Sequence, residues 1–176
     1  AAIATGRLEI AIHPADTLRG HLERNPRIVE ALNELWTTER ALIDQYVARS
    51  KVCVARGQHE IGERFSSFAF TEMREVSAIL DRIIALEGMP RIQRVEPVAV
   101  GESVTEQLRL SLDYERRTIA RLEETLGVCE EEKDSETVAL LIEDLNRERE
   151  HLAWLEEELL KRGGDPSGSG PRDEVD

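Results

Sequence analysis

Apolar residues recur every three or four positions through four long stretches of the chain, and polar residues fill the positions between them. This spacing is that of one face of an α-helix, and it predicts an all-α fold. The predicted helices cover about 26–55, 59–87, 103–132 and 135–162. Gly57 ends the first helix, and Gly88 with Pro90 ends the second. Four amphipathic helices of this length predict a four-helix bundle.

The sequence also predicts how two helices begin and how the bundle is connected. Asn25 before Pro26 is a typical N-cap and first helical position, and Ser103 with Glu106 forms a capping box. Residues 88–102 contain two prolines and two glycines and show no helical period. A connection this long favours a crossover that runs the length of the bundle between the second and third helices.

Each apolar stripe is interrupted by a glutamate at a position where a core residue is expected. The four glutamates are Glu39, Glu72, Glu115 and Glu148. A buried carboxylate costs free energy unless it is paired or bound to a cation. One such residue carries little information, whereas one in every helix indicates a shared site.

The spacing of these glutamates indicates an internal duplication of a helical hairpin. Glu39 and Glu72 are 33 positions apart, and so are Glu115 and Glu148. In each half the first glutamate lies 18 positions before the turn and the second lies 15 positions after it. At about 1.5 Å per residue, all four lie roughly 25 Å from their turns and share one level of the bundle.

Two further side chains join this level, because Glu75 and His151 each follow a stripe glutamate by one helical turn. Five carboxylates cannot share a dry core without neutralisation, and two divalent cations supply about four positive charges. Oxygen ligands with one imidazole favour iron or manganese over structural zinc. The alternative is that some of these glutamates lie on exposed flanks and pair with Arg40, Arg74 or Arg147.

Composition narrows the expected partners and location. The chain has 176 residues, a net charge of −13 and 34% charged residues. We expect it to bind neither nucleic acid nor a membrane, because it is acidic and has no apolar run long enough to span a bilayer. Cys53 and Cys129 fall at opposite ends of antiparallel helices, so we expect free, buried thiols. With no recognisable secretory signal at the start, the cytoplasm is the expected location.

Taken together, these residues resemble those of the bacterioferritins, within the ferritin-like di-iron proteins. The stretches that carry the resemblance are ERALIDQY (39–46), EMREVSAILDRIIALEGMPRIQ (72–93), GESVTEQLRLSLDYE (101–115) and EREHLAWLE (148–156). The resemblance covers roughly residues 26–160. It implies a ferritin-like bundle with two iron ions inside it, manganese being the other candidate.

The resemblance implies a role for each candidate ligand. Glu39 and Glu115 correspond to terminal ligands of the two metal ions. Glu72 and Glu148 correspond to the bridging carboxylates, and they are the residues we expect to be catalytic. His151 corresponds to the histidine that binds one of the two ions.

Glu75 is the main departure from the family pattern, in which a histidine occupies this position. A glutamate replaces a neutral nitrogen ligand with an anionic oxygen ligand. The ligand set is then harder, in the sense of hard and soft metal ligands, and one charge more negative. Either Glu75 binds metal with an altered affinity or metal preference, or it swings away and leaves one ion weakly held.

Two residues near the predicted centre have two interpretations each. Tyr46 lies two turns after Glu39 and is either a catalytic hydrogen-bond or electron donor or a core tyrosine with a satisfied hydroxyl. Met73 follows Glu72 and points about 100° around the helix, away from the core. By resemblance it is the axial ligand of a haem b shared between two subunits, and the alternative is an ordinary interface methionine.

The resemblance implies a ferroxidase that oxidises ferrous iron with dioxygen or peroxide and stores the product in a cage of 24 subunits, of one or two kinds. The alternatives are a haem-carrying structural subunit of a mixed cage and a ferritin-like di-metal oxidase outside iron storage. We expect an N-terminal extension over 1–24, the bundle over 25–162, and a disordered acidic tail over 163–176 in place of the family's fifth helix.

Overall fold

The computed structural model of the protein describes residues 25–91 and 97–167, and these residues form four α-helices without any strand. The helices are α1 (Pro26–Ala55), α2 (His59–Ala85), α3 (Val104–Glu131) and α4 (Ser135–Lys161). The predicted all-α four-helix bundle is therefore confirmed. The expectations for 1–24, and for the tail from residue 168 onward, lie outside the described residues. None of the four helices has an apolar segment long enough to cross a bilayer.

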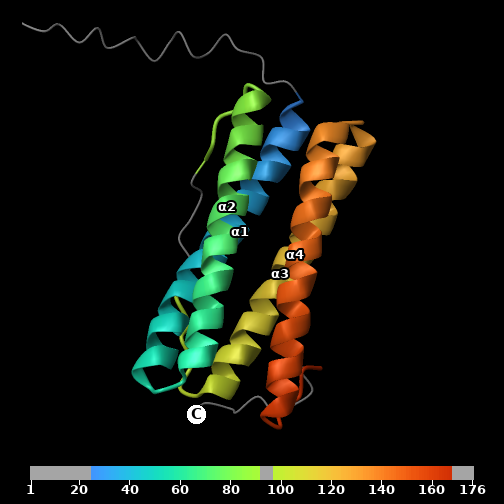
Figure 1. Cartoon of the computed structure of the whole chain (residues 1–176). Coiled ribbons are helices and arrows are strands. Elements are labelled where there is room, and N and C mark those ends of the chain that lie inside the picture. The colour runs from blue at the N-terminus through green and yellow to red at the C-terminus, as the bar shows by residue number, and fades with distance from the viewer. Residues whose placement is uncertain (1–24, 92–96, 168–176) are drawn as a thin grey trace, which may run out of the picture.

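The helices form two antiparallel hairpins, α1 with α2 and α3 with α4 (Figure 1). The end of α2 and the start of α3 lie at opposite ends of the bundle, so the connection between them runs along its length (Figure 1). α1 packs against both α2 and α3, and α4 packs against α3 and α2. The predicted crossover is thus present.

Buried polar side chains of α1 hold the two described parts of the crossover. Near the start of α1, Asn33 accepts a hydrogen bond from the backbone N–H of Arg91 at 2.6 Å. Further along α1, Gln45 accepts one from the N–H of Ala99 at 3.0 Å, and Arg49 donates two to the Ala99 carbonyl at 2.9 and 3.1 Å. Polar groups buried in this way need such partners, so the contacts hold the two described parts of the connection against α1.

The helix starts agree with one sequence prediction and contradict another. The Ser103 hydroxyl accepts the N–H of Glu106 at 3.1 Å, which confirms Ser103 as the N-cap of α3. The Glu106 side chain accepts the N–H of Glu102 instead of that of Ser103, so the reciprocal half of the capping box is displaced by one residue. Asn25 does not cap α1, because its backbone adopts a left-handed conformation (φ 57°) instead of the extended one that a capping side chain needs. Its side chain donates instead to Glu132, at the end of α3, at 3.1 Å.

The apolar core consists of two clusters, one toward each end of the bundle. One cluster includes Leu32, Trp36, Val76, Leu122 and Leu145, and the other includes Leu42, Phe68, Ala69, Leu112 and Leu155. Along every helix, the stripe glutamate lies between a member of one cluster and a member of the other. The glutamates therefore form a polar layer that apolar packing closes on both sides. Cys53 and Cys129 are free and buried, as expected.

Candidate metal centre

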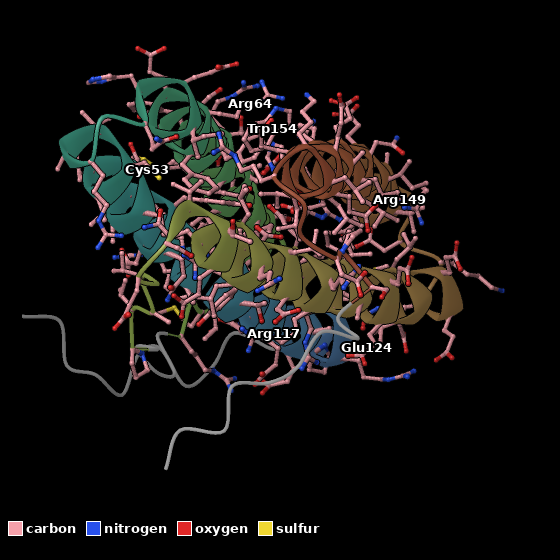
Figure 2. The ribbon with its side chains drawn as sticks, turned by 90° about the horizontal axis from the view of Figure 1, so that it is seen from below. Cys53, Arg64, Arg117, Glu124, Arg149 and Trp154 are labelled. Atoms are coloured by element: carbon pink, nitrogen blue, oxygen red, sulfur yellow. The ribbon has the colours of Figure 1, made fainter. Side chains whose placement is uncertain are left out.

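Each of the four helices contributes a fully buried glutamate to the polar layer. Glu39, Glu72, Glu115 and Glu148 all have a relative exposure of 0%. The helical period places them there, because each continues the stripe that faces the bundle axis. Other charged residues of α3 and α4, such as Glu124 and Arg149, lie on the outside of the bundle (Figure 2).

Four of the candidate ligands lie within reach of one ion. Glu72, Glu115, Glu148 and His151 each offer a ligand atom, and these atoms all lie within 4.8 Å of one another. The Nδ1 atom of His151 is 3.2 Å from Glu72 Oε1 and 3.7 Å from Glu115 Oε1. Nδ1 has no hydrogen-bond partner within the described part of the chain, and the carboxyl groups of Glu72 and Glu115 interact with that of Glu148.

A second group of ligand atoms lies next to the first and shares one residue with it. Glu75, Asp144 and Glu148 offer atoms within 4.8 Å of one another, and all three side chains are buried. Glu148 is the residue that the two groups share. Glu39 is fully buried in the layer but belongs to neither group.

Many buried oxygens of this layer have no hydrogen-bond partner among the described residues. They are both carboxylate oxygens of Glu39, Glu72 and Glu148, together with Glu75 Oε2, Glu115 Oε2 and Asp144 Oδ1. Native proteins leave few buried polar atoms unpaired, and each exception needs an explanation such as a bound ion. Cations coordinated between the helices would satisfy all of these atoms together.

The electrostatics of the layer also favour bound cations. Burial raises the pKa of Glu115 to about 8 and that of Asp144 to about 7, and it raises the pKa of Glu39, Glu72 and Glu148 well above the usual range. These carboxyl groups therefore resist ionisation unless a positive charge joins them. Two divalent cations and one arginine nearly balance six carboxylates, so the arrangement is a candidate di-metal site.

The imidazole of His151 has the protonation state that metal binding requires at neutral pH. Burial, with the nearby charges of Arg64 and Arg147, lowers the pKa of His151 to about 4. His151 is therefore neutral at pH 7, which is the form that binds metals. The ring of Phe68 lies 4.0 Å from the imidazole ring, measured between centroids.

Aromatic side chains enclose the histidine side of the centre. The Tyr46 hydroxyl donates a hydrogen bond to Glu115 Oε1, and the Tyr46 ring packs against Phe68. Arg64 lies over the ring of Trp154 at 5.5 Å, and Figure 2 shows the pair together beside α2 and α4. Phe68 and Tyr46 are buried, and such apolar surroundings strengthen electrostatic interactions in the site.

Glu75 is buried and is also paired with Arg147, one of the three arginines named above as alternative partners of the glutamates. Its Oε1 atom accepts a hydrogen bond from Arg147 Nε, and its Oε2 atom has no partner. Met73 projects away from the centre and is 52% exposed, so it is separate from the buried ligands.

Sequence reasoning missed Asp144. The side chain is 1% exposed, and its position three residues after Leu141 and four before Glu148 lies on the same helical face. The signal was therefore present, but the neighbouring Leu145 fills the expected apolar position and conceals it.

A bundle in which every helix buries a carboxylate beside a histidine is typical of ferritin-like metal-binding proteins. The sequence model of a protein family described as a ferritin-like domain matches residues 29–163 of this chain. A bacterioferritin of Mycobacterium leprae (strain TN) is 35% identical over 81% of this chain and 89% of its own. A bacterial ferritin of Synechocystis is 33% identical over 78% and 89%, and a bacterioferritin of Streptomyces coelicolor is 31% identical over 78% and 83%. The chain therefore belongs to the bacterioferritin family.

Proposed function

We propose that this chain is an iron-storage subunit that oxidises ferrous iron at the centre inside the bundle. The observation that carries the proposal is the layer of six buried carboxyl groups, most of whose oxygens have no partner within the described structure. Glu39 and Glu115 act as terminal ligands, Glu72 and Glu148 as bridging ligands, and His151 as the nitrogen ligand of one ion. Glu75 acts as a ligand of the other ion.

Ferrous iron is the substrate of the proposed reaction. Two ferrous ions each give up one electron, and one dioxygen molecule takes both electrons with two protons and leaves as hydrogen peroxide. With peroxide as the oxidant, the same two electrons and two protons yield two water molecules. Hard, anionic oxygen ligands favour the ferric product, and Glu148 can contact both ions because it belongs to both ligand groups.

The proposal is tested by adding ferrous iron to apoprotein in air and following the absorbance of the ferric product. We expect rapid oxidation by the native chain and only the rate of protein-free solution for the double variant Glu72→Gln with Glu148→Gln. The matched control is Glu130→Gln with Glu150→Gln, which changes two exposed glutamates of the last two helices. Equal rates for the native chain and the first double variant would contradict the proposed role.

We further infer that Met73 binds haem b shared with a second copy of the chain. Its thioether is exposed and lines a surface pocket of about 400 Å³ together with Arg40, Asp44 and other side chains of α1 and α2. A soft sulfur ligand beside a hollow with a cationic side chain suits a haem and its carboxylates. Titration with haem is expected to give one haem for two chains, and Met73→Ala is expected to abolish its spectrum.

Exposed apolar side chains of α1 and α2 support assembly into a cage. Val47, Val54, Phe70 and Ile84 are exposed apolar side chains of α1 and α2, as is Met73. Exposed apolar surface of this kind is typical of an interface between subunits. We propose a 24-subunit cage, which light scattering of the purified chain tests through its mass. The two buried free cysteines fit a reducing compartment, and we propose the cytoplasm.

One observation favours the alternative of a haem-carrying subunit with little turnover of its own. Arg147 occupies one oxygen of Glu75, and this pairing competes with an ion at that position. In that case the purified chain alone oxidises iron slowly, and a catalytic partner subunit restores the rate. A di-metal oxidase outside storage would instead oxidise iron without retaining a ferric core.

A further inference from the structure

Asp144 has the properties of a metal ligand that the family resemblance does not assign. The side chain is 1% exposed, and its Oδ1 atom has no hydrogen-bond donor among the residues that the structure describes, while the carboxyl groups of Glu39 and Glu75 interact with it. α4 carries Asp144 one turn before Glu148, and its ligand atom lies within 4.8 Å of those of Glu75 and Glu148. These three residues lie together in the half of the centre that has no histidine.

Arg147 acts as the counter-charge of this half in the absence of metal. Its Nε donates to one oxygen of Glu75, while the other oxygen of Glu75 is buried without a partner. The Arg147 side chain is 34% exposed, and its Nη1 lies 3.9 Å from Glu143, which is 75% exposed. The guanidinium therefore has a carboxylate toward the solvent to which it can turn when it leaves Glu75.

We propose that Asp144 is a metal ligand that completes an all-oxygen position with Glu75 and Glu148, from which an incoming divalent cation displaces Arg147. The inference rests on the proposed di-metal centre and specifies its second position. Three carboxylates without nitrogen or sulfur suit hard cations such as Mn²⁺ and Fe²⁺. The competing explanation is structural: Asp144 only shares a proton with the neighbouring carboxyl groups and never binds metal.

Titration with Mn²⁺ alone separates the two explanations, because Mn²⁺ suits oxygen ligands and its binding can be measured without iron oxidation. The electron paramagnetic resonance signal of free Mn²⁺ counts the ions bound by each chain. The native protein is expected to bind two ions. Asp144→Asn, which keeps the shape of the side chain, is expected to weaken the second ion at least tenfold and to leave the first unchanged.

A second variant tests the same metal position and is expected to change the Mn²⁺ affinity in the opposite direction. Arg147→Gln removes the cation that competes for Glu75 and is expected to tighten the second Mn²⁺ ion by about tenfold. The control variant Glu150→Gln changes an exposed carboxylate of the same helix and is expected to bind as the native chain does. Circular dichroism confirms that each variant is folded before the titration.

The outcomes distinguish this inference from the proposal on which it rests. Two ions bound by both the native chain and Asp144→Asn with equal affinities would overturn the role of Asp144 and leave the di-metal centre intact. No Mn²⁺ bound by the native chain would overturn both. In crystals soaked in manganous chloride, we expect two anomalous peaks, the second about 2.2 Å from a carboxylate oxygen of Asp144. A second peak that contacts only Glu39 and the bridging residues would also overturn the inference.

Discussion

The two halves of the carboxylate layer differ in chemistry, although Glu75 and His151 occupy matching positions of two similar hairpins. In one half, His151 lies beside Glu72 and Glu115, and aromatic rings close the site. In the other half, Glu75 and Asp144 replace nitrogen by oxygen, and Arg147 enters from the surface. The first half contains a histidine that is neutral at pH 7. The second half contains an acidic side chain, Glu75, whose charge is balanced by Arg147.

This difference shows that the repeated spacing sets the level at which side chains meet in the bundle. It does not set which ligand atoms those side chains offer. The stripe glutamates of both hairpins reach one level because the helical rise is constant. One turn after each α2 or α4 glutamate, however, the chain carries Glu75 in one hairpin and His151 in the other. The two proposed ions therefore meet different ligands, and the following predictions test that asymmetry.

The largest effect is expected from Glu148, the residue common to both ligand groups. Glu148→Leu is expected to abolish binding of both ions. It is also expected to stabilise the apoprotein by about 1–4 kcal/mol, because a leucine replaces a buried, unpaired carboxyl group. Scanning calorimetry in the presence of a chelator measures the second effect as a rise in Tm. The control Glu150→Leu changes an exposed position of α4, and an apoprotein Tm that falls for Glu148→Leu would contradict the prediction.

The pH dependence of the apoprotein is expected to be nearly as large. The folded-state pKa of Glu115 is raised to about 8 and that of Asp144 to about 7, so the folded chain binds more protons than the unfolded chain at neutral pH. The stability that these two carboxyl groups contribute is fully present below their unfolded pKa values and is lost as the pH rises through 7 and 8. Denaturant unfolding between pH 6.5 and about 8.5 checks this, since the lowered pKa of His151 affects only more acidic conditions.

Bound metal is expected to reverse that trend. Cations bind the ionised carboxylates, so their affinity increases over the same pH range and protons are released on binding. Calorimetric titration with Mn²⁺ at pH 7 in two buffers of different ionisation enthalpy counts the protons. Equal heats in the two buffers would show that the carboxyl groups are already ionised and would remove the basis of the preceding prediction.

Removal of the histidine is expected to affect only one half of the centre. His151→Asn should weaken Co²⁺ or Zn²⁺ at the first position by about 10–100-fold, because His151 supplies the nitrogen ligand of that group in the described structure. The second Mn²⁺ ion should change by no more than a few-fold. The visible spectrum of bound Co²⁺ reports the first position. Equal losses at both positions would show that the two halves are not separate in their ligand chemistry.

The smallest effect is expected from Tyr46. Its hydroxyl donates to Glu115 and opposes the rise in that residue's pKa, so Tyr46→Phe removes one hydrogen bond worth about 1 kcal/mol. Affinity for the ion beside His151 should fall severalfold at pH 7. Tyr114→Phe is a suitable comparison, since Tyr114 bonds to Gln45 outside the centre. A larger loss in Tyr114→Phe than in Tyr46→Phe would contradict the assignment.

Much of the fold could be predicted from the sequence, because the signals that define it are local. The apolar period, Gly57 and the capping box at Ser103 gave four helices close to those observed. The N-cap at Asn25 could not be predicted correctly, because its side chain bonds to Glu132, 107 positions away. Local patterns carry no information about partners so distant in the chain.

By itself the sequence determined that acidic side chains from all four helices share one level, since helical rise and turn position depend only on the count of residues. Only the tertiary structure decided which of them meet. Arg147 reaches Glu75 from a helix 72 positions away, and Asp144 joins them because α2 and α4 pack side by side. Charge and burial depend on distances in space, and folding alone sets those distances.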